Sequence, residues 1–230
     1  SLKRRIIKKM KKLICKIAAT SLAFVATILA IVGIALLKTN EIKIALNLNA
    51  ITIAVALALL WAGFLLVEIL KNDNKMFLLI SMIILLVGVN LFSTILTSIF
   101  STSEETTTNP SLISILEIAL LIVAYVFALK DKKWGSIVVI VILALNLVTL
   151  YTSFISLNAS IASLEAETTY ISNTTQKLIS SYKGMEMLIL AIELGFVSQI
   201  TYFCTNLINE DTKTKEDSKQ ETIEENKTEE

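Results

Sequence analysis

The chain has 230 residues, 54% of them hydrophobic, and its 21 Lys and Arg residues nearly balance its 20 Asp and Glu residues. A mean hydropathy of +0.71 excludes a soluble globular domain, because a core of this size cannot bury so much apolar surface, and it favours a protein of the lipid bilayer. The chain contains no His, which excludes His-based catalysis and His-ligated metal sites.

Six apolar segments, each of 18 to 26 residues, follow one another along the chain. A helix rises about 1.5 Å per residue, so each segment can cross a hydrocarbon core of roughly 30 Å. The apolar runs lack the alternation of β-barrel strands, and the single proline, Pro110, lies between two of them. The predicted fold class is all-α, an integral membrane bundle within residues 17–208 whose six transmembrane helices span 17–37, 45–70, 77–100, 112–129, 135–157 and 185–208.

A basic stretch, residues 1–16, precedes the first apolar segment. We expect its cations to bind anionic lipid headgroups, each contributing about 1 kcal/mol near the surface. A signal peptide also begins with basic residues, but the run at 17–37 is longer than the usual apolar region of about 7 to 15 residues, so a retained helix is expected. No nucleic-acid partner is expected, because no aromatic residues or recognition module accompany these charges. The cations are Lys3, Arg4, Arg5, Lys8, Lys9, Lys11 and Lys12.

The positive charges gather in alternate loops. The N-terminal stretch, the loops after the second and fourth segments, and the C-terminal tail together hold 17 of the 21 Lys and Arg residues. By the positive-inside rule, both termini are expected in the cytoplasm of a protein of the cell membrane. The tail, residues 209–230, holds nine acidic residues and four Lys with almost no hydrophobic content, so it is predicted to be disordered.

Small residues form stripes along the first two predicted helices. Helices in lipid associate through close backbone approach, so each stripe predicts a face that docks another helix. The two helices are expected to form a tight hairpin, although the sequence leaves open whether a stripe faces another subunit. The stripes are Ala19, Ala23, Ala26, Ala30 and Gly33 in the first helix, and Ala50, Ala54, Ala58 and Ala62 in the second.

The external segment between helices five and six, residues 158–184, carries apolar residues at helical spacing. It predicts an amphipathic helix or helix pair. A straight helix of this length would project far from the membrane, so the segment is expected to fold back as a hairpin that covers the bundle. The alternative interpretation is a surface that binds partners or further copies of the chain.

Four polar residues within apolar segments are the candidate site. Glu117 and Glu193 are expected in the outer leaflet, with Asn90 and Asn146 opposite. An acid inside a membrane usually faces protein or water, so these residues can line a proton or cation site. The alternative is that they form interhelical hydrogen bonds, worth about 0.6 kcal/mol apiece.

No phosphate-binding glycine loop, zinc-protease motif or nucleophile elbow occurs in the sequence, so neither an enzyme nor a cofactor is expected. The favoured function is that of an assembly or accessory subunit, which binds itself or another membrane protein through its small-residue faces and external segment. The alternative function is a small channel, or a transporter coupled to protons or cations, that uses Glu117 and Glu193.

Overall fold

The computed structural model describes residues 2–37, 44–72, 75–100, 112–166 and 173–208. Every regular element in these ranges is a helix, which confirms the all-helical prediction. Five of the helices are long and apolar enough to cross a membrane, and α4 is a shorter apolar helix. In chain order they are α1 (Leu2–Leu37), α2 (Ile44–Glu68), α3 (Met76–Phe100), α4 (Leu112–Leu129), α5 (Lys133–Ala166) and α6 (Asn173–Ile208).

Three helices extend well beyond their predicted spans. Helix α1 starts at Leu2, so the basic stretch is helical, and α5 continues to Ala166 while α6 starts at Asn173. The predicted external segment is therefore divided between α5 and α6, with residues 167–172 outside the described part. Buried Leu157 and Ile161 continue the apolar face of α5, which gives its last turns a packing partner in α6. The predicted acidic tail, 209–230, lies outside the described residues.

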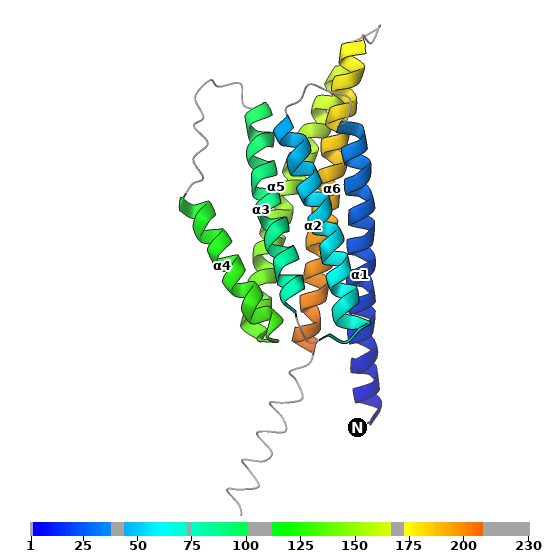
Figure 1. The fold of residues 1–230 in the computed structure, drawn as a ribbon, viewed down its shortest axis with the longest axis vertical. Coiled ribbons are helices and arrows are strands. Elements are labelled where there is room, and N and C mark those ends of the chain that lie inside the picture. Colours follow the sequence, from blue (N-terminus) through cyan, green and yellow to red (C-terminus); the bar gives the residue numbers. More distant parts are fainter. Residues whose placement is uncertain (1, 38–43, 73–74, 101–111, 167–172, 209–230) are drawn as a thin grey trace, which may run out of the picture.

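The ends of α5 and α6 prolong the bundle instead of covering it (Figure 1). Helices α5 and α6 pack on each other, and the residues that would join them in a hairpin, 167–172, lie outside the described part of the chain. An ion pair links the two extensions, with Lys183 Nζ 3.0 Å from a carboxylate oxygen of Glu165. The extension of α6 also contacts α1, since the Ser180 hydroxyl donates a hydrogen bond to the Leu36 carbonyl at 3.3 Å.

The most extensive helix pair in the bundle is α1 with α6, followed by α5 with α6. Helix α2 packs on both α3 and α1, so the expected contact between the first two helices is present but is not the main contact of α1. Helix α4 packs mainly on α5 and has few contacts with α3. The ribbon of its first half diverges from those of the other helices (Figure 1).

The small-residue stripe of α1 is buried inside the chain. Ala19, Ala23, Ala26 and Ala30 have no exposed surface, and Gly33 meets the backbone of α6 at Gly184. In the α2 stripe, Ala50 and Ala54 are buried, while Ala58 and Ala62 are half-buried. Small side chains allow this close packing, which supplies the van der Waals contact that holds helices together in lipid.

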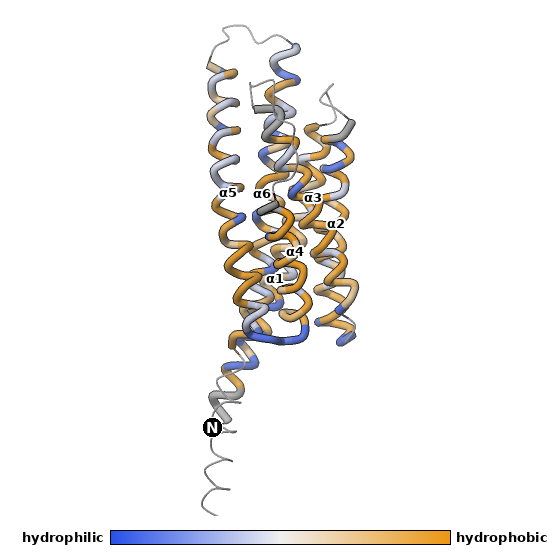
Figure 2. The backbone as a smooth tube through the Cα atoms, turned by 90° about the vertical axis from the view of Figure 1, so that its left-hand side faces the viewer, coloured by the Kyte–Doolittle hydropathy of each residue, from blue (hydrophilic) through white to orange (hydrophobic). Residues whose placement is uncertain are grey.

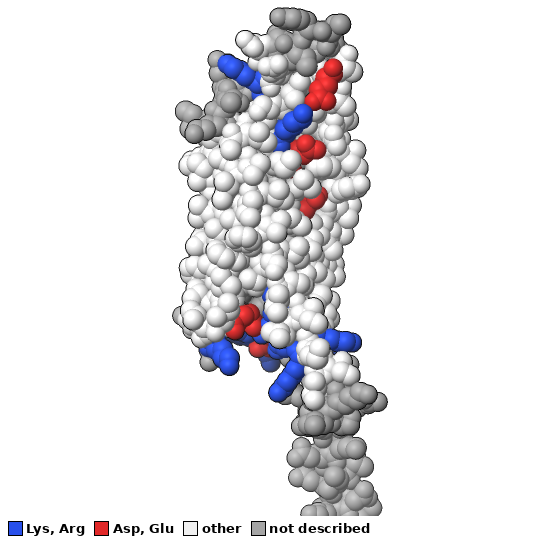
Figure 3. Space-filling view, turned by 90° about the vertical axis from the view of Figure 1, so that its right-hand side faces the viewer, with Lys and Arg blue, Asp and Glu red and all other residues white. Residues whose placement is uncertain are grey.

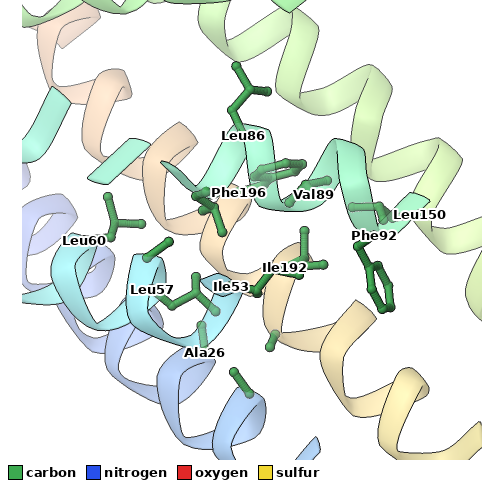
Figure 4. Packing of buried hydrophobic residues seen from close by; sticks show 14 of the residues in the cluster. Ala26, Ile53, Leu57, Leu60, Leu86, Val89, Phe92, Leu150, Ile192 and Phe196 are labelled. Atoms are coloured by element: carbon green, nitrogen blue, oxygen red, sulfur yellow. The ribbon is translucent and has the colours of Figure 1, made fainter. Parts of the chain in front are cut away.

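The core lies where five helices meet, as the close view in Figure 4 shows. Ala26 of α1, Ile53 and Leu57 of α2, Phe92 of α3, Leu150 of α5, and Ile192 and Phe196 of α6 are all buried there. Helix α4 adds Leu121, Ala124 and Tyr125 from its second half. From the first half of α4, Ile118 is half-buried and packs against this core, whereas Ile115, Leu116 and Leu120 are exposed.

The outer surface of the bundle is apolar over most of its length. Hydrophobic residues dominate the middle of the helices and hydrophilic ones lie toward the ends (Figure 2). Charged side chains gather near the two ends of the face in Figure 3, with a broad uncharged band between them. Only 17% of the most apolar stretch of α5 is buried, against 56% for α6. Such a surface suits lipid, which solvates exposed apolar side chains as well as a protein interior does.

Candidate functional site

Two of the predicted polar residues meet on the outward side of α4 and α5. The Asn146 side-chain amide donates a hydrogen bond to Glu117 Oε1 at 2.9 Å and another to the Ile142 carbonyl of its own helix at 3.0 Å. Glu117 is exposed and Asn146 is half-buried. Helix α4 reaches this contact from its first half, which diverges from the bundle (Figure 1).

Glu193 occupies a different place, a shallow groove of about 360 Å³. Its Oε1 is buried and accepts no hydrogen bond from the described part of the chain. The groove surrounds the carboxyl group with apolar side chains from three helices and the Tyr151 ring. Its lining is Leu29 of α1, Leu147 and Tyr151 of α5, and Leu190, Leu194 and Val197 of α6.

The four predicted residues therefore do not share one site in this structure. Glu117 and Asn146 are joined, whereas the groove of Glu193 includes neither of them. The Asn90 amide donates to the Leu86 carbonyl in its own helix at 2.9 Å. In the described ranges, no three His, Cys, Asp or Glu side chains are grouped so that they could hold a metal ion.

Other polar side chains are buried in the bundle outside the predicted site. The Tyr125 hydroxyl donates to Gln199 Oε1 at 2.5 Å, while Gln199 Nε2 has no partner among the described residues. Both side-chain polar atoms of Asn49 are likewise buried and without a described partner. Tyr125 belongs to a continuous apolar run, so only the contact between α4 and α6 reveals its polar role.

A second polar site lies at the end of the bundle where α1 begins. Four lysines and two acids line a pocket of about 330 Å³, named here the lysine pocket, at Lys12, Lys16, Lys71, Lys75, Glu68 and Asp131. Asn206 of α6 also lines it and donates 2.9 Å hydrogen bonds to the Ala128 carbonyl and the Ser136 hydroxyl. These bonds tie the end of α6 to the turn between α4 and α5.

Ion pairs organise the lysine pocket. Lys16 of α1 pairs with Glu68 at the end of α2. Lys75, just before α3, lies 3.2 Å from an Asp131 carboxylate oxygen and donates to the Leu129 carbonyl at 2.8 Å. The Leu129 carbonyl is one of the last in α4 and has no hydrogen-bond donor within the helix. The Lys75 ammonium supplies that donor, and its positive charge is favourable because the C-terminal end of a helix carries partial negative charge.

The residues predicted to anchor lipid headgroups are only partly described. Lys12 faces the lysine pocket, Lys9 and Lys11 are exposed, and Lys8 is half-buried. The side chains of Lys3, Arg4 and Arg5 lie outside the description. The sequence placed the lysines of the pocket in the N-terminal stretch and in the loop after the second apolar segment. It did not indicate that the fold brings these lysines together.

These features define a class: an all-helical bundle whose long apolar helices fit a lipid bilayer. The chain matches no protein-family model, no curated protein and no solved structure. The functional argument therefore depends on the sites themselves.

Proposed function

We propose that this chain is a non-enzymatic, multi-pass protein of the cell membrane that assembles with further copies of itself. It has six spans and both termini in the cytoplasm. Helix α4 has 18 apolar-rich residues, which give about 27 Å of helix against a hydrocarbon core of roughly 30 Å. The lysine pocket lies at the end where α1 begins and α6 finishes, and the positive-inside rule supports a cytoplasmic location for that end.

The observation that carries the assembly proposal is the contact between Glu117 and Asn146 on the outward surface. Exposed leucines do not favour assembly in a membrane, because lipid tails solvate them equally well. A carboxyl group and an amide behave differently from leucine, because lipid tails offer them no hydrogen bonds and their exposure to lipid therefore costs free energy. A second protein surface that covers this pair and supplies hydrogen bonds would remove this cost.

The chemistry of the pair suits a second copy of the chain. The Asn146 side-chain amide donates hydrogen bonds to Glu117 Oε1 and to the Ile142 carbonyl. Asn146 Oδ1 and Glu117 Oε2 are left without partners among the described residues. A protonated Glu117 can donate through Oε2 to an Asn146 Oδ1. Two copies related by a twofold axis can therefore exchange two identical hydrogen bonds, a self-complementary arrangement typical of homodimers.

Mass measurement of the full chain in lipid nanodiscs or mild detergent tests this function. The unchanged chain is expected as a dimer or larger assembly, and Glu117→Leu or Asn146→Leu is expected to shift it toward monomer. Glu117→Gln, which keeps a donor and an acceptor, is expected to retain assembly. Asn158→Leu is the matched control, because Asn158 is exposed on the extension of α5. A strictly monomeric unchanged chain, or equal effects of Asn146→Leu and Asn158→Leu, contradicts the proposal.

Glu193 supports a second candidate function, movement of protons or cations. Its Oε1 is buried in an apolar groove without a described partner, and acids in this state mark ion pathways in many membrane proteins. Flux into liposomes that contain the full chain tests this candidate, with Glu193→Gln compared against Glu165→Gln outside the groove. Flux that equals that of empty liposomes, or that survives Glu193→Gln unchanged, rejects it.

A further inference from the structure

We propose that the lysine pocket binds a phosphate group, carried by an anionic lipid headgroup or by free phosphate. This site is separate from the face proposed for assembly. Its six charged residues come from α1, from the ends of α2 and α4, and from the residue before α3. Four lysines against two carboxylates give the lining a formal charge of +2.

The two acids of the pocket are already paired. Glu68 binds Lys16, and Asp131 binds Lys75. Lys12 and Lys71 complete the lining without forming a salt bridge to either acid. Two ammonium groups therefore add their charge to one pocket, and they repel each other and the paired lysines. A bound anion would turn this repulsion into attraction.

The backbone around the pocket supports a specific role. Lys71 and Asp131 are the residues other than glycine with positive φ in the described part of the chain, at 47° and 59°. Both positions follow the end of a helix, where glycine usually takes the left-handed conformation. Both residues line the pocket, and a glycine at either position would remove a charged side chain from it. Backbone strain of this kind is common where a side chain serves a binding site.

The chemistry of the lining points to phosphate among common anions. A lysine ammonium is a compact charge with three donors, and several of them can surround the oxygens of one phosphate. The pocket opens at the end of the apolar bundle, where the headgroups of a bilayer would lie. Basic pockets between helices at the cytoplasmic surface are typical binding sites for anionic headgroups.

Binding to the full chain in nanodiscs tests the site at constant ionic strength. One arm measures phosphatidylglycerol retained by the protein, and the other measures stabilisation by inorganic phosphate in neutral phosphatidylcholine. The pocket variant is Lys12→Gln with Lys71→Gln, which leaves both ion pairs intact. The matched control is Lys9→Gln with Lys11→Gln, which removes the same charge from exposed positions on α1.

The pocket variant is expected to bind about tenfold more weakly, and the control is expected to change binding by less than about twofold. If the pocket variant loses binding only to phosphatidylglycerol, the ligand is a lipid headgroup. If it loses stabilisation only by inorganic phosphate, the ligand is free phosphate. Asp131→Asn supplies an independent variant, expected to tighten binding several-fold because it removes a competing carboxylate while tolerating positive φ. Equal weakening in pocket and control variants, or no weakening in either arm, overturns the proposal.

Discussion

The backbones of Gly33 in α1 and Gly184 in α6 are in direct contact. A Cβ atom added to Gly33 would lie 2.9 Å from the Gly184 carbonyl oxygen, and one added to Gly184 would lie 2.8 Å from the Gly33 carbonyl oxygen. Both obstacles are backbone atoms, so a larger residue must push the helices apart. The stripe of small residues that ends at Gly33 therefore serves packing within the chain.

Gly33→Ala is expected to lower the free energy of unfolding by about 1 to 3 kcal/mol, because it overpacks the contact between α1 and α6. Unfolding in mixed detergent micelles measures this change. Gly88→Ala is the matched control, since its added Cβ would first meet the Ile53 side chain at 3.2 Å, and a side chain can adjust. Equal losses in the two variants would show that the backbone contact is not the cause.

Tyr125→Phe is expected to destabilise the protein by about 1 kcal/mol, because it removes the hydroxyl that bonds to buried Gln199. Among the described residues, Gln199 would then have no partner for either its side-chain oxygen or its amide nitrogen. Adding Gln199→Leu to Tyr125→Phe is expected to recover most of the loss. A double-mutant cycle of unfolding free energies tests this coupling, and simply additive effects would contradict it.

Asn49→Leu is expected to raise the free energy of unfolding by about 1 kcal/mol or more. The Asn49 side chain is 5% exposed, and neither of its polar atoms has a partner in the described part of the chain. Leucine has similar size and no polar atom to bury, so it removes a desolvation cost without leaving a cavity. Thermal melting in detergent measures the effect. A lower melting temperature would mean that Asn49 has a polar partner in the folded protein.

Asp131 separates the effects of backbone strain and ion pairing. The turn after α4 has Schellman bonds, with the Asp131 amide donating to the Ala128 carbonyl at 3.0 Å and the Lys132 amide to the Phe127 carbonyl at 3.0 Å. Asp131→Gly removes the ion pair with Lys75, which is worth about 0.2 to 1 kcal/mol because the Asp131 side chain is 68% exposed. Glycine adopts positive φ without strain, so the substitution also stabilises the turn by a similar amount.

Little net change in unfolding free energy is therefore expected for Asp131→Gly. Asp131→Val is expected to cost about 1 to 3 kcal/mol, because a β-branched residue strongly disfavours positive φ. Thermal melting of both variants measures the difference. Equal melting temperatures for the glycine and valine variants would contradict the assignment of strain at this position.

Several parts of the fold followed from local sequence. Continuous apolar runs predicted the helices, and polar residues such as Lys71 and Lys130 predicted where α2 and α4 end. The candidate site was harder to predict than the fold. The sequence singled out Glu117 and Asn146 because polar residues are rare in apolar segments, but it grouped them with Glu193, which lies in a separate groove.

By itself, the sequence determined the helical class, the apolar surface and the charge at each end, because these depend on composition and on spacing along one segment. Only the tertiary structure decided that α1 packs chiefly on α6, that α4 diverges, and that Lys12 and Lys71 share a pocket. In lipid, apolar faces do not drive helices toward particular partners. The choice depends on close contacts such as that between Gly33 and Gly184, and spacing along a single helix does not specify its partner.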